Sequence, residues 1–394
     1  MNSSGADRAR EWFNTYTRDL SSEDLQRLFT HDTRDAYKFF SRGLDEEQVA
    51  RLPWWKRIAV RTRQVFVAFT LKLPPARRAL YLGALLFALI GFFKLFRGFA
   101  ILPVPFGTPF FQISMLVPAW ADGTFALIVS LLMVNLLVLL EVADRLSLKG
   151  ELEVAREIQL AMLPGGTYRS GDIEICGATR PANTVGGDFY DVLPLSDGRV
   201  ILAVGDVAGK GSPAALLMAL LLAILRTLVD EGLPLPALVQ RLNLQVSRHA
   251  PASRFITLFL ASYTPATGRL EFVNAGQTPP LLRRKDGTIE RLLSGGVALG
   301  MFEGSTYQAG EIVLNPGDAL LMYSDGMTEA ESPDGQPFDE AGLERTLALY
   351  AGAYQQSAAA QLGKAVFDAV ERHRRDQRLA DDLTVLVLSR LQTA

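Results

Sequence analysis

Four short motifs in the second half of the chain place an aspartate beside glycine or beside a second aspartate. In three of them the acid adjoins an apolar, strand-like run, and a carboxylate there is costly to desolvate unless a nearby group compensates its charge. The motifs are Gly186-Gly187-Asp188-Phe189-Tyr190-Asp191, Gly205-Asp206-Val207-Ala208-Gly209-Lys210-Gly211 after VILAV, Tyr323-Ser324-Asp325-Gly326 after ALLMYS, and Asp381-Asp382-Leu383-Thr384 opening LTVLVL.

A divalent cation would supply that compensation, because carboxylate, carbonyl and water oxygens are the ligands that Mg2+ and Mn2+ prefer. Each motif also has a purely structural interpretation. Asp325-Gly326 is a common turn pair, Asp206 is placed to cap the helix that begins near Ser212, and Asp382 fits a solvated turn. The four motifs together are more specific than any one of them, so the sequence favours a metal site.

Other catalytic chemistries lack their recognisable parts. The run GDVAGKGS resembles a phosphate-binding loop, but only three residues separate Gly205 from Gly209, and Gly211 follows Lys210. The single cysteine, Cys176, lies in the strand-like run DIEICGA and is predicted to belong to the core. The three histidines lie far apart along the chain, which argues against a histidine-based zinc hydrolase or a serine triad; they are His31, His249 and His373.

The elements that must position these acids are mostly short strands. Apolar runs predict strands at 200–204, 256–262, 270–273, 311–314, 319–323 and 383–388. Helical patterns cover 213–228, 235–246 and 358–373. Strand runs with grouped helices predict an α+β sandwich, in which sheets pack on each other and helices lie outside.

The motifs in this order resemble the SpoIIE/RsbU-like branch of the metal-dependent PPM serine/threonine phosphatases, from about residue 151 to residue 391. The resemblance implies a β-sandwich of two antiparallel sheets flanked by helices, with two divalent cations, Mn2+ or Mg2+, bound at one end. The matching segments are ELEVAREIQLAMLP, PANTVGGDFYD, GDVAGKGSPAAL, NAGQTPP, GGVALG, YSDGMTEA and DDLTVLVL.

The same resemblance implies roles for individual residues. Asp206 corresponds to the carboxylate that bridges the two metals, and the backbone carbonyl of Val207 to a further ligand. The remaining acids are Asp188, Asp325 and Asp381, with Asp382 as a neighbour that contributes. No side chain is then the nucleophile, because the metals activate a water molecule that attacks the phosphoester.

Two other positions bear on the substrate and on proton transfer. Arg180 is a candidate for contact with the substrate phosphate, although a surface arginine beside Pro181 explains it equally well. The family often has histidine after Asn-Ala-Gly, whereas this chain has Gln277. Because glutamine does not titrate, this departure puts a role in proton transfer at position 277 in doubt. It does not affect the predicted metal ligands.

The chain also carries membrane-like segments, and its mean hydropathy is positive. Residues 124–140 contain no charge and approach the roughly 20 apolar residues that cross a bilayer. Residues 79–93 form a shorter run that continues past Lys94 and Arg97, whose long side chains can reach the interface. We predict a transmembrane helical hairpin; the alternative is one spanning helix and one buried or interfacial helix.

Basic residues concentrate outside the two apolar runs, which places both flanks in the cytoplasm. We therefore predict a multi-pass protein of the cell membrane. Its order is a cytoplasmic helical arm at 1–78, two transmembrane helices with a short extracytoplasmic connector at 79–140, an amphipathic linker helix at 141–165 and a cytoplasmic phosphatase domain at 166–394. The flanking basic residues are Lys56, Arg57, Arg61, Arg63, Lys72, Arg77 and Arg78 before the first run, and Arg145, Lys149 and Arg156 after the second.

The linker has apolar residues at helical spacing until Pro164 ends the pattern. It is expected either to form a homodimeric coiled coil or to pack on its own domain. The apolar positions are Leu148, Leu152, Ala155, Ile158 and Met162.

Charge and family resemblance together define the expected function. With 40 lysines and arginines against 42 acidic residues, the chain has no basic surplus for nucleic acid. We expect a membrane-anchored phosphatase that acts on phosphoserine or phosphothreonine of a protein. By family analogy that protein is a small anti-anti-sigma (STAS-type) factor in bacterial partner switching. The competing interpretation is a catalytically silent scaffold that binds phosphoproteins, and the retention of all four acidic motifs argues against it.

Overall fold

The computed structural model describes residues 53–95, 99–105, 112–118, 120–251, 254–350, 358–375 and 377–391. The chain divides into two compact units, Met1–Arg145 and Leu146–Ala394, which are considered separately. Most of the predicted cytoplasmic arm, residues 1–52, lies outside the described residues.

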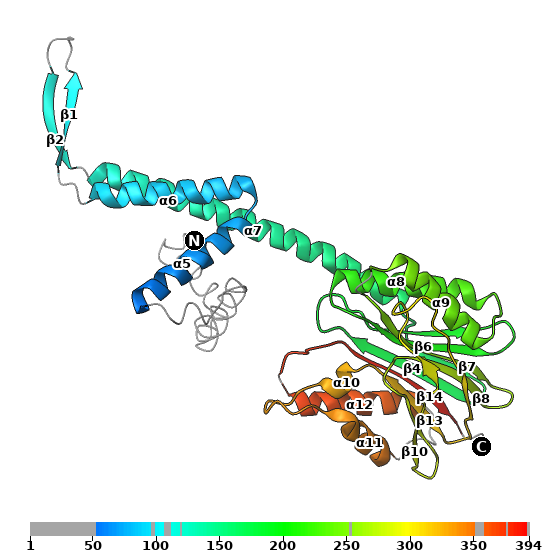
Figure 1. Cartoon of the computed structure of the whole chain (residues 1–394). Coiled ribbons are helices and arrows are strands. Elements are labelled where there is room, and N and C mark those ends of the chain that lie inside the picture. The colour runs from blue at the N-terminus through cyan, green and yellow to red at the C-terminus, as the bar shows by residue number, and fades with distance from the viewer. Residues whose placement is uncertain are drawn as a thin grey trace, which may run out of the picture. The chain divides into compact units, whose positions relative to one another are not determined.

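The first unit is built on helices. Helix α5 spans Trp54–Lys72, α6 spans Pro75–Leu95, and α7 runs without a break from Trp120 to Met162 and continues into the second unit. The second apolar run and the predicted linker are therefore parts of one helix. The connector between α6 and α7 holds an antiparallel hairpin of β1, Phe99–Pro105, and β2, Gln112–Pro118, which the sequence did not predict (Figure 1).

Helices α6 and α7 approach each other closely because small residues lie at their contact. Ser130 Oγ donates a hydrogen bond to the Ala84 carbonyl at 2.8 Å, and a Cβ atom at Gly91 would lie 2.9 Å from the Gly123 carbonyl oxygen. Their large apolar side chains are exposed outward, among them Phe93 at 65% and Leu131 at 61%. Such an apolar outer surface is what lipid-facing helices present.

By length and composition, three helices in the described residues are able to cross a membrane: Pro75–Leu95, Gly123–Met162 and Ser212–Val229. The third differs from the others because it lies in the second unit and buries much of its apolar face. Met218, Leu222 and Leu225 of this helix are fully buried in the protein core. Only the first two therefore match the predicted membrane segments.

The second unit contains two sheets. The first has the strand order β10-β9-β13-β14-β4-β3; the second has the order β11-β8-β7-β6-β5, with β12 also paired to β8. All pairings within them are antiparallel except that of β11 with β8. The strands are β3 Thr167–Ser170, β4 Ile173–Arg180, β5 Phe189–Pro194, β6 Val200–Val207, β7 Ile256–Thr264, β8 Arg269–Ala275, β9 Leu281–Arg283, β10 Ile289–Arg291, β11 Gly295–Gly296, β12 Gly310–Val313, β13 Ala319–Tyr323 and β14 Leu383–Arg390.

Helices cover the outer faces of both sheets. Helices α8, Ser212–Val229, and α9, Leu235–His249, lie on the second sheet; α11, Asp339–Leu349, and α12, Ala358–Arg374, lie on the first, and the short α10, Gly326–Glu329, follows β13 (Figure 1). The predicted α+β sandwich is confirmed.

Residues along β13 alternate between two cores. Leu320 and Met322 belong to the core that includes both sheets, whereas Leu321 and Tyr323 belong to the core beneath α11 and α12. Successive side chains of a strand point to opposite faces, so a strand covered on both faces is apolar at every position. This explains why the runs ALLMY and LTVLVL carry no polar alternation.

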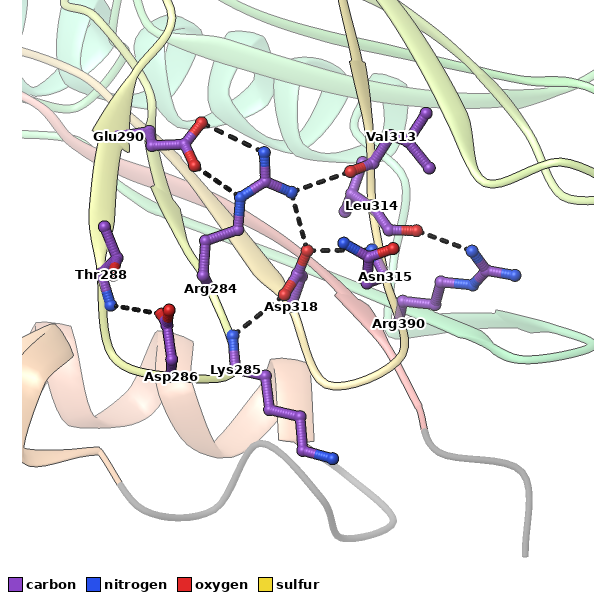
Figure 2. A network of polar contacts seen from close by, with 10 residues as sticks. All are labelled: Arg284, Lys285, Asp286, Thr288, Glu290, Val313, Leu314, Asn315, Asp318 and Arg390. Carbon is purple, nitrogen blue, oxygen red and sulfur yellow. Dashed lines mark hydrogen bonds and ion pairs between the residues drawn. The ribbon is translucent and has the colours of Figure 1, made fainter.

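A network of ion pairs fixes one end of β13 (Figure 2). The Arg284 guanidinium lies 2.7 Å from Glu290 and 2.9 Å from Asp318, and Asp318 is only 2% exposed. Asp318 also accepts hydrogen bonds from the backbone N–H groups of Lys285 and Asn315. The β9–β10 hairpin is thereby tied to the turn before β13, at the opposite end of that strand from Asp325.

Gly177 on β4 provides the first test of this packing. A Cβ atom there would clash with the ring of Tyr190, whose hydroxyl donates to the Pro164 carbonyl at 3.0 Å. Gly177→Ala should lower the free energy of unfolding of the second unit by about 1–3 kcal/mol. Calorimetric melting measures this, with Gly165→Ala as the control because a Cβ atom there meets nothing within 4 Å. Equal melting temperatures for the two variants would contradict the packing.

Candidate metal centre

The antiparallel registers bring the predicted acids to one end of each sheet. Phe189 on β5 pairs with Gly205 on β6 in antiparallel register. Asp188, which precedes Phe189, and Asp206, which follows Gly205, therefore lie at the same end. Tyr323 on β13 pairs with Val385 on β14, so Asp325 and the Asp381-Asp382 pair also lie together. Residues far apart in the sequence thus meet because neighbouring antiparallel strands begin where the other ends.

Contacts between the loops show that these two groups of acids lie side by side. Asp382 Oδ2 accepts a hydrogen bond from the backbone N–H of Gly187 at 2.7 Å, and its Oδ1 accepts one from Ala182 at 2.8 Å. A Cβ atom at Gly187 would lie 2.9 Å from Asp206 Oδ1 and 2.9 Å from the Val207 carbonyl oxygen. Glycine is therefore required here for close approach of backbone to carboxylate.

The gathered carboxylates raise one another's proton affinity. Burial raises the pKa of Asp188 well above its usual value, and the Asp206 carboxylate adds to the rise. Burial, with Asp325 and Asp381 adding to it, raises the pKa of Asp206 to about 7. Burial and Asp381 also raise the pKa of Asp325, while Lys210 opposes the rise. Positive charge placed among them would be strongly stabilised.

Lys210 supplies part of that positive charge. Its Nζ lies 2.8 Å from Asp381 Oδ2 and also donates to the Ala380 carbonyl. Throughout the part of the chain that the structure describes, no three acidic, histidine or cysteine side chains already surround one point as ion ligands do.

The donor set nevertheless fits a hard divalent cation in its chemistry. It offers carboxylates and the Val207 carbonyl, and Asp188 Oδ2 is buried without a hydrogen-bond partner. A buried carboxylate oxygen in that state is destabilised unless a cation or a donor reaches it. Oxygen donors of this kind suit Mg2+ or Mn2+.

Comparison with known proteins shows which family the chain resembles. The model of the family described as stage II sporulation protein E (SpoIIE) matches residues 196–391. The phosphoserine phosphatase RsbU of Bacillus subtilis is 29% identical over 245 residues, which cover 62% of this chain and 71% of RsbU. Protein IcfG of Synechocystis is 31% identical over 224 residues, which cover 50% of this chain but only 35% of IcfG.

A solved structure supports the fold. The SiaA-PP2C domain of Pseudomonas aeruginosa aligns with a TM-score of 0.54 and 21% identity, over 63% of this chain and 98% of that domain. Residues 196–391 therefore form a SpoIIE-type domain, and the second unit resembles the SpoIIE/RsbU-like branch of the PPM phosphatases. Three of the four acidic motifs, those of Asp206, Asp325 and Asp381, lie within the matched residues 196–391, and the Asp188 motif lies before them. The roles of individual residues as metal ligands stay predictions.

Asp382 has a positioning role that the sequence did not reveal. Both of its carboxylate oxygens accept hydrogen bonds from backbone N–H groups of residues 182–188, the loop that carries Asp188. Asp382 is 6% exposed, so these bonds are shielded from water. Its predicted contribution to the metal shell stays a prediction, whereas its attachment of this loop to β14 is visible in the structure.

Gln159 is a further residue that sequence reasoning missed. Its side-chain amide donates to the Gly186 carbonyl at 2.7 Å and accepts from the Gly186 N–H at 3.1 Å, and the residue is 6% exposed. Helix α7 is therefore clamped to the loop before Asp188. The available signal was a polar residue on the helix face that also carries Leu152, Ala155 and Met162.

Arg180 and Asp191 are held by ion pairs. The Arg180 guanidinium bonds to Glu371 on α12, so contact with a substrate phosphate stays a prediction. Asp191 is buried and lies 2.8 Å from Arg226 of α8, which also donates to the Met162 carbonyl. Asp191 thus joins α8 to the end of α7.

The Gln159 clamp makes a measurable prediction for the SpoIIE-type domain. Gln159→Leu frees the loop that carries Asp188 and should weaken Mn2+ binding roughly tenfold, as removal of a group that orients a metal ligand does. Calorimetric titration of the full chain with Mn2+ measures the affinity. Glu157→Leu, an exposed position on the same helix, is the matched control. Equal affinities for the two variants would show that the clamp does not order the site.

Proposed function

We propose that this protein is a membrane-anchored, divalent-cation-dependent phosphatase that hydrolyses phosphoserine or phosphothreonine on a protein substrate. The observation that supports it most is the convergence of Asp188, Asp206, Asp325 and Asp381 at one end of a SpoIIE-type sandwich. The matched region spans about a third of IcfG and 71% of RsbU. Because the match to IcfG is partial, we propose the activity of the whole protein and do not transfer it from these relatives.

The residues that would hold the cations follow from their placement. Asp206 and the Val207 carbonyl lie against the Gly187 backbone, with Asp188, Asp325 and Asp381 around them. Two cations, Mn2+ or Mg2+, when bound there supply Lewis acidity and neutralise charge on the phosphoryl oxygens. The protein itself contributes position: Asp382 holds the loop of Asp188, and Lys210 directs a further positive charge toward the acids.

The substrate proposal extends the similarity to RsbU, which is named a phosphoserine phosphatase. We propose a small anti-anti-sigma (STAS-type) protein as the substrate, in a bacterial partner-switching pathway. The class of reaction rests on the site, whereas the identity of the phosphoprotein rests on this similarity alone.

Membrane anchoring is proposed from the first unit. Helices α6 and α7 are long and apolar enough to span, pack through small residues and expose apolar side chains outward. Arg77 in the first turn of α6 pairs with Glu141 at 3.2 Å and Asp144 at 2.7 Å, just after the apolar run of α7, and we propose that these charges face the cytoplasm. The basic flanks support a hairpin whose arm and phosphatase domain are cytoplasmic.

A homodimer through the end of α7 is also proposed. Helices α7 and α8 border an apolar groove of about 350 Å3, and Ile158 and Leu216 beside it are 59% and 72% exposed. A second copy covering it would act on α8, which follows Asp206, and on Gln159, which holds the loop of Asp188.

Replacement of Asp206 tests the catalytic proposal. The full chain should release phosphate from p-nitrophenyl phosphate with Mn2+, and Asp206→Asn should lower the rate at least about a hundredfold because a carboxylate proposed to hold the cations is lost. Asp334→Asn, at an exposed position, is the control. Absence of phosphate release by the unmodified chain with either Mn2+ or Mg2+ would favour the silent scaffold.

Charges placed on the apolar face test the homodimer. Leu152→Glu with Ile158→Glu should abolish self-association in detergent, because like charges would be buried at the contact. The same double variant should change phosphate release by at least about fivefold, the lower range of coupling between sites. Sedimentation and phosphate release measure the two effects, with exposed Glu153→Ala as the control. Unchanged mass and turnover would refute this regulation.

A further inference from the structure

The segment between α12 and β14 is unusually basic and leads directly to the acids of the metal centre. Residues 371–378 contain four arginines against Glu371 and Asp376, and Asp381 follows three residues later. Arg372, Arg375 and Arg378 are exposed. Asp376 lies outside the described residues, so the structural argument concerns the arginines and Glu371.

Two arginines from different elements share one carboxylate beside this segment. Arg374 at the end of α12 lies 2.5 Å from Glu371, and Arg180 at the end of β4 bonds to the same side chain. Arg374 is only 17% exposed, and its Nε is buried without a hydrogen-bond partner. The single carboxylate of Glu371 therefore neutralises only one of the two guanidinium charges. One positive charge and part of the N–H donors stay available to a ligand.

The turn after α12 keeps an arginine in a conformation that suits glycine. Arg375 has a φ of 53°, and its N–H donates to the Glu371 carbonyl at 3.0 Å, as in a left-handed helix C-cap. Glycine would adopt this conformation at lower cost than arginine. Arg375 thus adds an exposed positive charge at a position where the backbone conformation alone would favour glycine.

A narrow cavity is lined both by arginines of this segment and by residues of the candidate metal centre. It has a volume of about 10 Å3, room for a single water molecule, and its lining includes Arg374, Arg378, Gly326 and Asp381. Arg378 also lies 3.4 Å from Asn183 Oδ1, in the loop that leads to Asp188. Glu329 and Glu331 line the same cavity, whereas the exposed Arg375 is not part of its lining.

We propose that Arg180, Arg374, Arg375 and Arg378, the arginine rim, bind acidic side chains that flank the phosphorylated residue of the protein substrate. The proposal rests on the proposed function and adds a specificity to it. Favourable interaction with the helix dipole explains cations in the last turn of α12, but Arg378 and Arg180 lie outside that helix. Arg378 lines the cavity beside Asp381, and Arg180 pairs with Leu383 of β14 two residues after Asp381, an arrangement that fits recognition of a negatively charged segment.

Binding of two labelled peptides tests the rim. Both carry phosphoserine at the centre; one has aspartate and glutamate on each side, and the other has asparagine and glutamine. The full chain in detergent should bind the acidic peptide with a Kd about fivefold lower, a ratio that shrinks as salt screens the charges. Fluorescence anisotropy measures both Kd values without requiring turnover.

Variants assign that preference to the rim. Arg375→Gln with Arg378→Gln should bring the ratio of the two Kd values close to one. Arg269→Gln, an exposed arginine paired with Glu311 on the β8–β12 edge, should keep the ratio of the unmodified chain. Equal Kd values for the two peptides in the unmodified chain, or an undiminished ratio in the double variant, would overturn the proposal.

Hydrolysis of p-nitrophenyl phosphate, measured on the same preparations, separates this proposal from the proposed function. Turnover of the aryl phosphate with equal peptide Kd values would overturn the rim alone. Peptide preference without turnover would overturn the phosphatase and support the rim as a binding surface.

Discussion

Repulsion among buried carboxylates is the constraint that shapes the SpoIIE-type domain. Burial raises the pKa of Asp188 and Asp206, and the surrounding acids add to the rise, so both side chains are less stable here than in water as anions. Groups of this kind stay together only where the backbone fixes them, since mobile loops would move apart and hydrate their acids. The antiparallel registers, the Asp382 bonds and the Gln159 clamp each fix one part of that backbone.

The strand registers and these hydrogen bonds fix different parts of the fold. Strand register alone brings Asp188 beside Asp206 in one sheet and Asp325 beside Asp381 in the other. Hydrogen bonds from Gly187 to Asp382 and from Gln277 to the Tyr323 carbonyl cross from the loops of one sheet to the strand ends of the other. The metal centre therefore depends on how the two sheets pack, and the Gln159 hydrogen bonds to Gly186 link α7 to the loop that carries Asp188.

Much of the sandwich could be predicted because its strands are buried on both faces. The predicted strand at 319–323 coincides with β13, and the predicted helix at 235–246 lies within α9. Strand β11 consists of Gly295–Gly296 and has no apolar signal, so its parallel pairing with β8 depends on tertiary packing alone. The continuity of α7 was hidden because its apolar and amphipathic halves have different patterns.

For the site, sequence reasoning could identify residue types but not their hydrogen bonds. Aspartates beside strand ends are visible in the sequence, and the structure brings them together. The role of Asp382 was hidden, because its partners Ala182 and Gly187 lie in a distant part of the chain. The same holds for the shared use of Glu371 by Arg180 and Arg374, which join a strand end to a helix end.

Gln277 shows how a departure from the family pattern is accommodated. Its Oε1 accepts from Thr257 Oγ1 at 2.5 Å, and its Nε2 donates to the Tyr323 carbonyl at 3.2 Å. Thr257 in turn accepts from the Asp206 N–H at 3.2 Å, while Tyr323 precedes the Ser324-Asp325 turn. The neutral amide of Gln277 uses one donor and one acceptor here. It thus links the strand ends that carry Asp206 and Asp325. Because both ends of the side chain are engaged and the residue is buried, its contribution is to hold the two acids in register, and no proton needs to be transferred there.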